Sequence, residues 1–301
     1  MTLLVGLVGC GRWGANVLRD LMALGVDVSV AEPDASRRAR ARAAGAVSDV
    51  TSAEQLSHCD GYVVVTPAHT HREVCEQLFP HRVPVFVEKP PATALADVEA
   101  MVTAAPEQLF VMHKWRYHPG VRALADAATS GQLGTVQRLE TIRTGPAPLP
   151  ADVDVLWHLG THDLAISVEI LGPAARAREA RATRDVTGRI RACQATLTHP
   201  SGCEHRMTLA SSVPDRVRRV VITGTEATAV LEDAEATSIS VRGADRVEKI
   251  ALAPTSPLTE ELRAFVAHLD GGPPPVSDAA TALAIARQLS ALERLAEATR
   301  A

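Results

Sequence analysis

The sequence predicts an α/β domain built on a parallel sheet, followed by an α+β domain with an open, mainly antiparallel sheet. Up to about residue 115, short apolar runs alternate with helical stretches, which is typical of parallel strands covered on both faces. Beyond residue 134, several strand-like stretches follow one another across short turns, as antiparallel strands do. We therefore expect one domain at residues 1–117 and another at 118–301, whose C-terminal helix is able to pack back on the first domain.

The apolar runs mark the expected strands of the first domain, and the amphipathic stretches between them mark its helices. Strands are expected at 3–8, 26–31, 62–66, 84–88 and 108–112, with helices at 14–24, 35–44, 69–79 and 94–104. Residues 62–65 are apolar on both faces of their strand, as a buried parallel strand requires. Thr51-x-x-Glu54 fits the capping box of a further short helix.

The second domain mixes helices and strands in a different order. Helices are expected at 118–130, 155–171, 257–269 and 278–298. Strands are expected at 134–144, 188–198, 203–212, 216–224, 227–232 and 237–242. The Ala- and Arg-rich stretch 174–192 is interpreted as a compositional bias and not as a repeat.

Composition excludes several classes of partner and compartment. The net charge of −4 and the aromatic content of 3% leave neither the basic surface nor the stacking surface that nucleic-acid binding needs. The five cysteines are scattered and never in C-x-x-C spacing, so we expect a reduced, cytoplasmic protein. The N-terminus lacks the basic start of a signal peptide, and no apolar run reaches the ~18 residues of a membrane helix.

A glycine motif lies where the first strand meets the first helix. It follows the pattern G-x-G-x-x-G and comprises Gly9, Cys10, Gly11, Arg12, Trp13 and Gly14. In a dinucleotide site the first glycine allows a tight turn, the second lets the backbone approach a pyrophosphate, and the third lets the helix pack closely on the strand. The unpaired N–H groups of the helix N-terminus then attract the phosphates. The motif predicts a Rossmann domain that binds a dinucleotide.

The choice of cofactor depends on the end of the second strand. Glu32 lies 18 residues beyond Gly14, where a carboxylate can accept hydrogen bonds from both hydroxyls of the adenosine ribose. A 2′-phosphate beside that carboxylate would be repelled, so NAD is favoured. Arg37 and Arg38 follow closely and would serve NADP if they turned inward.

Two more polar segments come at the ends of expected strands. Glu88-Lys89-Pro90 ends the strand 84–88, at the edge of the sheet where ligands bind in open α/β folds. A lysine there can polarise a carbonyl or donate a proton. Thr66 and Pro67 follow strand 62–66 at the same edge, and we expect cofactor contacts from the segment made of Thr66, Pro67, His69 and His71, and from Glu88 and Lys89.

A third cluster runs from Asp154 through His158 to His162 and Asp163. At i, i+4 and i+8, the first three fall on one face of a helix. Such a face can hold zinc, but the chain lacks the H-E-x-x-H pattern and hydride chemistry needs no metal, so no metal is expected. A histidine that acts as acid or base fits better, because imidazole titrates near neutral pH.

The segment from His113 to Pro119 is dense in polar and aromatic residues where the chain leaves the first domain. A crossing between domains is a preferred location for ligands. Lys114, Arg116 and Tyr117 are therefore candidates for contact with an anionic or hydroxylated substrate, and the alternative is a linker held by ion pairs.

Together these motifs resemble those of the glucose–fructose oxidoreductase / inositol dehydrogenase (Gfo/Idh/MocA) family, along nearly the full length of the chain. The matching segments are Gly9–Gly14, Thr66-Pro67, Glu88-Lys89-Pro90, Lys114–Pro119, Ser130-Gly131-Gln132-Leu133-Gly134, His162-Asp163 and the tail from Pro257 to Phe265. The resemblance implies hydride transfer between NAD(P) and a carbinol or carbonyl carbon of a sugar, cyclitol or nucleotide-linked sugar. It also implies a homodimer or homotetramer formed through the open sheet.

The resemblance also assigns roles to residues. Lys89 is the lysine of the family's Glu-Lys-Pro motif, and His162 is the histidine usually assigned to proton transfer. The family's usual aspartate four residues earlier is His158 here, and Asp163 and His158 are expected near the substrate. Because an imidazole is not permanently negative, the division of acid and base roles stays open. Imine reduction on the same fold and a catalytically impaired nucleotide-binding regulatory or scaffold protein are the alternatives.

Overall fold

The computed structural model describes residues 2–298, and the chain divides into two compact units. The first unit comprises the chain up to Lys114 together with Ser256–Leu283, and the second comprises Trp115–Thr255 and the chain from Ala284 onward. The boundary therefore comes at residue 114 instead of 117. Residues 256–283, expected in the second domain, belong to the first, because their helix contributes side chains to its core.

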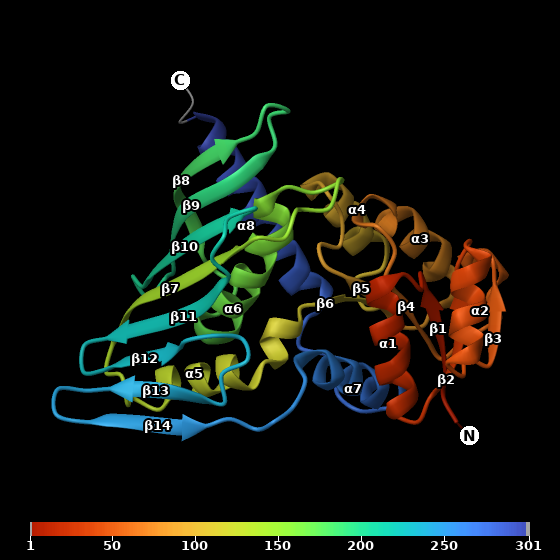
Figure 1. Ribbon diagram of the computed structural model, residues 1–301, viewed down its shortest axis with the longest axis horizontal. Coiled ribbons are helices and arrows are strands. Elements are labelled where there is room, and N and C mark those ends of the chain that lie inside the picture. Colours follow the sequence, from red (N-terminus) through yellow and green to blue (C-terminus); the bar gives the residue numbers. More distant parts are fainter. Residues whose placement is uncertain (1, 299–301) are drawn as a thin grey trace. The chain divides into compact units, whose positions relative to one another are not determined.

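The first unit contains a parallel sheet of six strands in the order β3-β2-β1-β4-β5-β6 (Figure 1). The strands are β1 (Leu4–Val8), β2 (Asp27–Ala31), β3 (Ser48–Val50), β4 (Gly61–Val64), β5 (Val85–Glu88) and β6 (Leu109–Met112). The short edge strand β3 was not among the predicted strands, because a three-residue segment has no hydrophobic period of its own.

The helices of this unit are α1 (Arg12–Ala23), α2 (Ala35–Ala43), α3 (His71–Leu78), α4 (Leu95–Ala104), α7 (Pro257–Leu269) and the start of α8 (Ala279–Ala298). Short 3₁₀ turns occur at Ala53–Gln55, Ala68–Thr70, Phe79–His81 and Lys114–Tyr117, the last of these crossing the boundary between the units. The predicted capping box does not form. The amide and hydroxyl of Thr51 donate to the side chain of Gln55 instead, and Ser52 precedes the turn without a side-chain cap.

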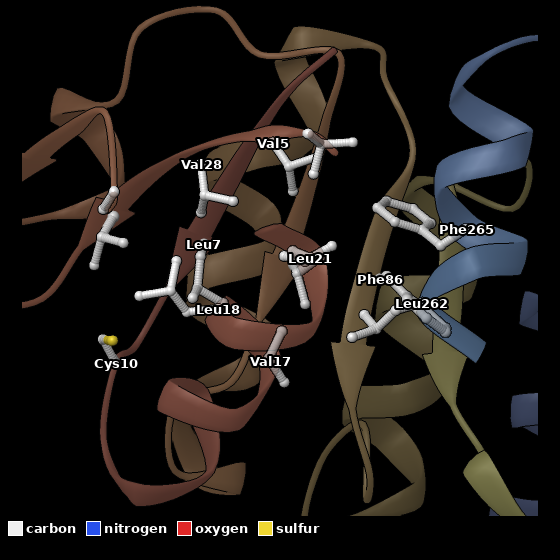
Figure 2. Close-up of a cluster of buried hydrophobic side chains, with 14 of the residues drawn as sticks. Val5, Leu7, Cys10, Val17, Leu18, Leu21, Val28, Phe86, Leu262 and Phe265 are labelled. Carbon is white, nitrogen blue, oxygen red and sulfur yellow. The ribbon is translucent and has the colours of Figure 1, made fainter. Parts of the chain in front are cut away.

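The core of the first unit joins the sheet to helices from both ends of the sequence. Leu18 and Leu21 of α1 pack with Leu7 of β1, and Figure 2 shows Phe265 of α7 beside Phe86 of β5. The rings of Phe86 and Phe265 are stacked, with centroids 5.0 Å apart. These contacts make α7 part of the core of the first unit.

The direction of α7 follows from its contacts with the sheet. A Cβ placed on Gly61, at the start of β4, would lie 2.7 Å from the Leu269 side chain. Phe265, one turn earlier in α7, contacts Phe86 within β5. Because all six strands are parallel, α7 runs against them and its first turns lie toward their carboxyl ends. In open α/β folds this is the edge of the sheet at which ligands bind.

The second unit contains a sheet of eight strands in the order β14-β13-β12-β11-β7-β10-β9-β8. Its neighbours are antiparallel except for the parallel pair β7 and β10. The strands are β7 (Val136–Gly145), β8 (Arg176–Arg184), β9 (Ile190–Thr198), β10 (Glu204–Ser211), β11 (Val217–Gly224), β12 (Thr228–Leu231), β13 (Ser238–Arg242) and β14 (Val247–Ala251). The predicted mainly antiparallel sheet is confirmed.

The two edge strands of this sheet, β8 and β14, were not predicted. The stretch interpreted as a bias contains β8, and no strand was predicted at β14. Both strands are half-exposed and carry charged side chains, a common way to protect a sheet edge against further pairing. Neither strand therefore has the apolar alternation on which the prediction relied.

The helices of the second unit are α5 (Pro119–Thr129), α6 (Thr161–Leu171) and most of α8. A π-helical turn (Leu156–Gly160) precedes α6, so the predicted helix 155–171 has the expected bounds but a wider first turn. Asp154 lies before this turn, where its carboxylate accepts hydrogen bonds from the amides of Leu156 and Trp157. Asp154 therefore caps the turn, and the expected regular spacing of three side chains along one helical face is lost.

Two buried histidines lie inside the second unit. The Nε2 atom of His205, on β10, lies 3.0 Å from the Thr141 hydroxyl, and that of His199 lies 3.0 Å from the Ser167 hydroxyl. Burial, with a smaller contribution from His199, lowers the pKa of His205 to about 3. Both rings are held as neutral hydrogen-bonding groups, since burial lowers the pKa of His199 as well.

Truncation of Phe265 to alanine should destabilise the protein by about 3–5 kcal/mol, because it removes a fully buried ring from the contact between α7 and β5. Urea denaturation measures the loss. Val186→Ala, at a fully exposed position, is the control and should change stability by less than about 0.5 kcal/mol. Equal effects of the two variants would mean that α7 does not anchor this core.

The protein should lose stability in acid through His205. The unfolded chain binds a proton near pH 6.5 and the folded chain only near pH 3, so stability falls as pH drops through this window, by up to about 1.4 kcal/mol per pH unit for this one group. His205→Gln keeps a polar partner for Thr141. In this variant the free energy of unfolding should depend less on pH in the acid limb, below about pH 6.5. His58→Gln, at an exposed position, should leave that limb unchanged, and a wild-type-like limb in His205→Gln would contradict the assignment.

Candidate active site

The glycine motif forms the loop between β1 and α1, and each glycine has a distinct constraint. Gly9 adopts φ +90°, and a Cβ there would lie 2.8 Å from the carbonyl oxygen of Val65. A Cβ on Gly14 would collide with the carbonyl of Gly9, so only glycine allows this close approach of helix and loop. At Gly11 the only atom near such a Cβ belongs to Arg37, 3.8 Å away, so the backbone is open to a ligand.

A cavity of about 610 Å³ opens beside this loop, entirely within the first unit. Its volume is in the range of pockets that bind cofactors. Predicted cofactor residues line it, namely Gly9, Gly11, Arg12, Trp13, Gly14, Glu32, Thr66 and Pro67. Other lining residues were not predicted to contact a cofactor, because no nucleotide-binding motif contains them; among them are Thr51, Ser52, Thr70, Glu73 and Gln77.

Glu32 lies at the end of β2 with only 3% of its surface exposed. One carboxylate oxygen accepts a hydrogen bond from the amide of Cys10 at 2.8 Å, and the other accepts from the amide of Asp34 at 3.1 Å. These bonds hold the carboxylate against the glycine loop at the wall of the cavity. A ligand at this wall therefore meets a fixed negative charge.

The two arginines beyond Glu32 differ in position. Arg38 donates to the backbone carbonyls of Glu32 and Pro33 and pairs with Asp49, so its guanidinium is held away from the cavity. Arg37 lines the cavity and lies 3.6 Å from the Glu32 carboxylate, with nearly half of its side chain exposed. Only Arg37 is therefore in a position to meet a ligand there.

The two histidines expected near the cofactor do not line the cavity. His69 is exposed, in the short turn before α3. His71 is buried, and its ring nitrogens lie 3.0 Å from the carbonyl oxygen of Pro90 and 2.8 Å from that of Thr66. His71 thus ties together the two loops that follow β4 and β5, and its contact with a cofactor stays a prediction.

Glu88 and Lys89 lie at the carboxyl end of β5, as expected from the sequence, although neither lines the cavity beside the glycine loop. The Glu88 carboxylate accepts a hydrogen bond from the amide of Lys89, and the peptide bond between Lys89 and Pro90 is cis. Burial raises the pKa of the Glu88 carboxyl, opposed by the positive charges of Lys89 and Lys114.

Lys114 follows β6 and reaches the glycine loop. Its ammonium lies 4.6 Å from the centre of the Trp13 ring, a cation–π contact. Of the 31 basic residues, only Lys89, Lys114 and Lys249 are lysines. Two of the three lysines thus lie at the carboxyl end of the parallel sheet. Lysine, unlike arginine, is able to exchange its proton in a protein site.

In the second unit, Trp115 is the centre of a group of polar side chains. Its ring stacks on His118 with centroids 4.8 Å apart and meets the edge of His162 at 6.4 Å. The Arg143 guanidinium, from β7, lies 4.3 Å from the same ring and donates to Asp163 at 2.5 Å. Neither Trp115, inside the matching segment Lys114–Pro119, nor Arg143, which belongs to no motif, was predicted as a site residue.

Asp163 has a different position from the one expected. Its side chain has no exposed surface and one oxygen pairs with Arg143, so it is not open to a substrate. His162 is nearly buried beside Trp115, and His158, in the π-helical turn, is half-exposed. Among residues 2–298, no three side chains of His, Cys, Asp or Glu gather closely enough to hold a metal ion.

The other two candidates for substrate contact are involved in contacts within the second unit. Arg116 pairs with Glu169 of α6 at 2.9 Å, and Tyr117 is buried with the Arg122 guanidinium 4.9 Å from its ring centre. For Arg116 the observed ion pair matches the alternative of a linker held by ion pairs.

The residues described in the structure include no helix that is long and apolar enough to cross a membrane.

Known proteins resemble this chain in sequence and in fold. Residues 3–113 match the family model described as an oxidoreductase family with an NAD-binding Rossmann fold. A myo-inositol dehydrogenase of Streptomyces leeuwenhoekii is 33% identical over 155 residues, which cover 49% of this chain and 48% of that protein. The UDP-N-acetylglucosamine 3-dehydrogenase of Acidithiobacillus ferrooxidans is 26% identical over 222 residues, 72% of this chain and 70% of that protein.

The likeness in fold extends over the whole chain. The solved structure of that Acidithiobacillus ferrooxidans enzyme has a TM-score of 0.87 at 23% identity and covers 99% of both chains. A levoglucosan dehydrogenase in complex with NADH has a TM-score of 0.89 at 17% identity, covering 99% of this chain and 98% of that one. In sequence, the match spans about half the length of the inositol dehydrogenase. Residues 3–113 therefore match the NAD-binding Rossmann part of the Gfo/Idh/MocA oxidoreductase family, and the chain as a whole has the fold of these solved dehydrogenases.

Proposed function

We propose that the protein is an NAD(P)-dependent oxidoreductase that transfers hydride between the nicotinamide and a carbinol or carbonyl carbon of a sugar, cyclitol or nucleotide-linked sugar. The observation that carries the proposal is the cavity beside the glycine loop, lined by Gly11 and Glu32 within the NAD-binding unit. The substrate class follows from relatives that are named dehydrogenases of inositol and of UDP-N-acetylglucosamine.

The residues around the cavity fit a dinucleotide. The backbone at Gly11 has no side chain to keep a pyrophosphate away, and α1 begins at the next residue with its free N–H groups. The fixed carboxylate of Glu32 suits the hydroxyls of an adenosine ribose. The bound dinucleotide supplies or accepts the hydride, and the protein supplies binding, orientation and proton transfer.

In this proposal Lys89 handles the proton of the reacting hydroxyl. A lysine ammonium at the carboxyl edge of the sheet stabilises a developing alkoxide and returns a proton to it in the opposite direction. His162 is proposed as the second proton-transfer group, on the strength of the family resemblance. The pair of Arg143 and Asp163 then positions His162 through Trp115, and is not itself a ligand of substrate.

His158 replaces the usual aspartate of the family, so a permanent negative charge is missing there. We propose that this half-exposed imidazole, together with Lys114, contacts the hydroxyl groups of the substrate. Arg116 and Tyr117 then support the linker without contacting the substrate, in keeping with their partners Glu169 and Arg122.

NAD is the proposed cofactor in preference to NADP. Glu32 is fixed by two backbone amides, and of the two arginines that follow it Arg38 is held elsewhere, so only Arg37 of that pair faces the negative charge at this wall of the cavity. A homodimer or homotetramer and a cytoplasmic location stay predictions. Light scattering of the purified chain measures the first, and fractionation of the source cells the second.

Lys89→Ala should lower kcat by about 10²–10⁴-fold with a sugar or cyclitol substrate, because it removes the proposed proton donor. NADH affinity, measured by energy transfer from Trp13, should stay close to that of the wild type, since Lys89 does not line the cavity beside the glycine loop. Lys249→Ala removes the exposed third lysine and is the control. Unchanged turnover in Lys89→Ala would contradict the proposed role and favour a protein that only binds the nucleotide.

Glu32→Gln should raise the affinity for NADPH relative to NADH by about tenfold or more, because repulsion of about 1–4 kcal/mol between a carboxylate and a 2′-phosphate disappears. The amide oxygen of glutamine still accepts the bond from Cys10, so the loop should keep its shape. Adding Arg37→Ala should abolish the gain, whereas adding Arg38→Ala should not. An equal preference in wild type and Glu32→Gln would refute this account of cofactor choice.

A further inference from the structure

Glu261 is a buried acid at the start of α7 that no proposed step uses. It precedes Phe265 by four residues, so the two side chains share one face of the helix. Phe265 stacks on Phe86, and α7 runs against the strands, so Glu261 lies one turn further toward the carboxyl end of β5. That strand ends at Glu88, which puts Glu261 beside the Glu88-Lys89 segment within the same unit (Figure 2 shows the contact of α7 with β5).

The surroundings of Glu261 do not suit a charged carboxylate. The residue is 1% exposed, and its Oε2 atom has no hydrogen-bond partner among residues 2–298. An ionised carboxylate that is buried with an unsatisfied oxygen costs several kcal/mol, and such a group usually takes up a proton instead. A protonated carboxyl avoids that cost because it is neutral.

The charges around Glu261 also affect whether its carboxyl group is protonated. Burial raises the pKa of Glu261 well above its usual value, and the negative charge of Glu88 raises it further. Lys114 and Lys89 oppose this shift. Two carboxyls and two lysines thus face one another at the carboxyl end of β5, and two carboxylates this close do not both ionise readily.

We propose that Glu261 is a positioning residue that stays protonated at neutral pH, so that of these two carboxyls only Glu88 is charged against Lys89 and Lys114. Its effect on Lys89 rests on the proposed function, whereas its protonation does not. The four groups then have a net charge of +1, from two ammonium groups and one carboxylate. An ionised Glu261 would bring this to zero.

The surplus positive charge acts on the proton of Lys89. A lysine beside another ammonium gives up its proton more readily than one paired with its own carboxylate. The neutral Glu261 therefore leaves the Lys89 ammonium able to release a proton to an alkoxide and to take one from a hydroxyl. Arginine in place of Lys89 would not serve, because its guanidinium does not lose its proton in this way.

The first test needs no enzyme activity. Wild type, Glu261→Gln and the control Glu260→Gln are unfolded with urea from pH 5 to pH 9. Glu260 is the preceding residue, and its carboxylate pairs with the exposed side chain of Arg263. An acid whose pKa is raised on folding holds its proton in the folded state, so wild-type stability falls as pH rises above the unfolded value near 4.5.

Glutamine imitates the protonated acid and cannot ionise, so Glu261→Gln should lack this fall. The ratio of its unfolding constant to that of the wild type should change by up to about tenfold per pH unit until Glu261 ionises in the folded protein. The corresponding ratio for Glu260→Gln should stay constant with pH. A constant ratio for Glu261→Gln would overturn the proposal, because Glu261 would then be ionised in both states.

If Glu261→Gln does not fold, infrared spectroscopy of the wild type shows whether Glu261 is protonated. Labelling of glutamate with ¹³C at the carboxyl identifies the C=O band of protonated glutamic acid at neutral pH, and Glu261→Asp should shift that band. No such band, or a band that Glu261→Asp leaves unchanged, overturns the proposal.

The second test separates positioning from a purely structural role. Near pH 7, Glu261→Gln should keep kcat/KM within about threefold of the wild type, because both then have a neutral side chain. At higher pH the two profiles should separate where the urea data show Glu261 ionising. Coincident profiles at every pH would limit Glu261 to a structural role. If NADH binds but no sugar or cyclitol turns over, the proposed function fails while the unfolding and infrared results still decide the protonation.

Discussion

The packing of α7 on β5 is the contact on which the rest of the first unit depends. Phe265 and Leu262 pack in the same buried cluster as Phe86 and the side chains of α1. The same contact sets the direction of α7 and brings Glu261 to the carboxyl edge of the strands. A hydrophobic contact thus determines which charges surround Glu88 and Lys89.

Charge placement at that edge follows a consistent physical logic. The Glu32 carboxylate accepts hydrogen bonds from two backbone amides, which hold it at the wall of the cavity. Glu261 is buried, and its Oε2 atom has no hydrogen-bond donor among the described residues, so we infer that its carboxyl group is neutral. The difference between the two acids lies in the backbone N–H groups that surround them, because hydrogen bonds to a carboxylate stabilise the charged form and burial alone destabilises it.

Motifs that lie in a short stretch of sequence were predictable, and contacts between distant stretches were not. The loop of Gly9, Gly11 and Gly14 and the acid at Glu32 were evident from order and spacing, since each residue serves a local backbone requirement. Arg143 and Glu261 carry no local signal. The use of lysine at only three positions in a chain rich in arginine agrees with the motifs that indicated Lys89 and Lys114.

The sequence by itself determined the two-part architecture, the parallel and antiparallel sheets and the dinucleotide loop, because hydrophobic period and glycine spacing are properties of neighbouring residues. Only the tertiary structure decided that α7 belongs to the first unit and that His71 and Asp163 are buried with partners inside the protein. Burial and hydrogen-bond partners arise from residues far apart in the chain. For that reason the sequence indicated which residues were candidates, whereas the fold decided which of them are open to a ligand.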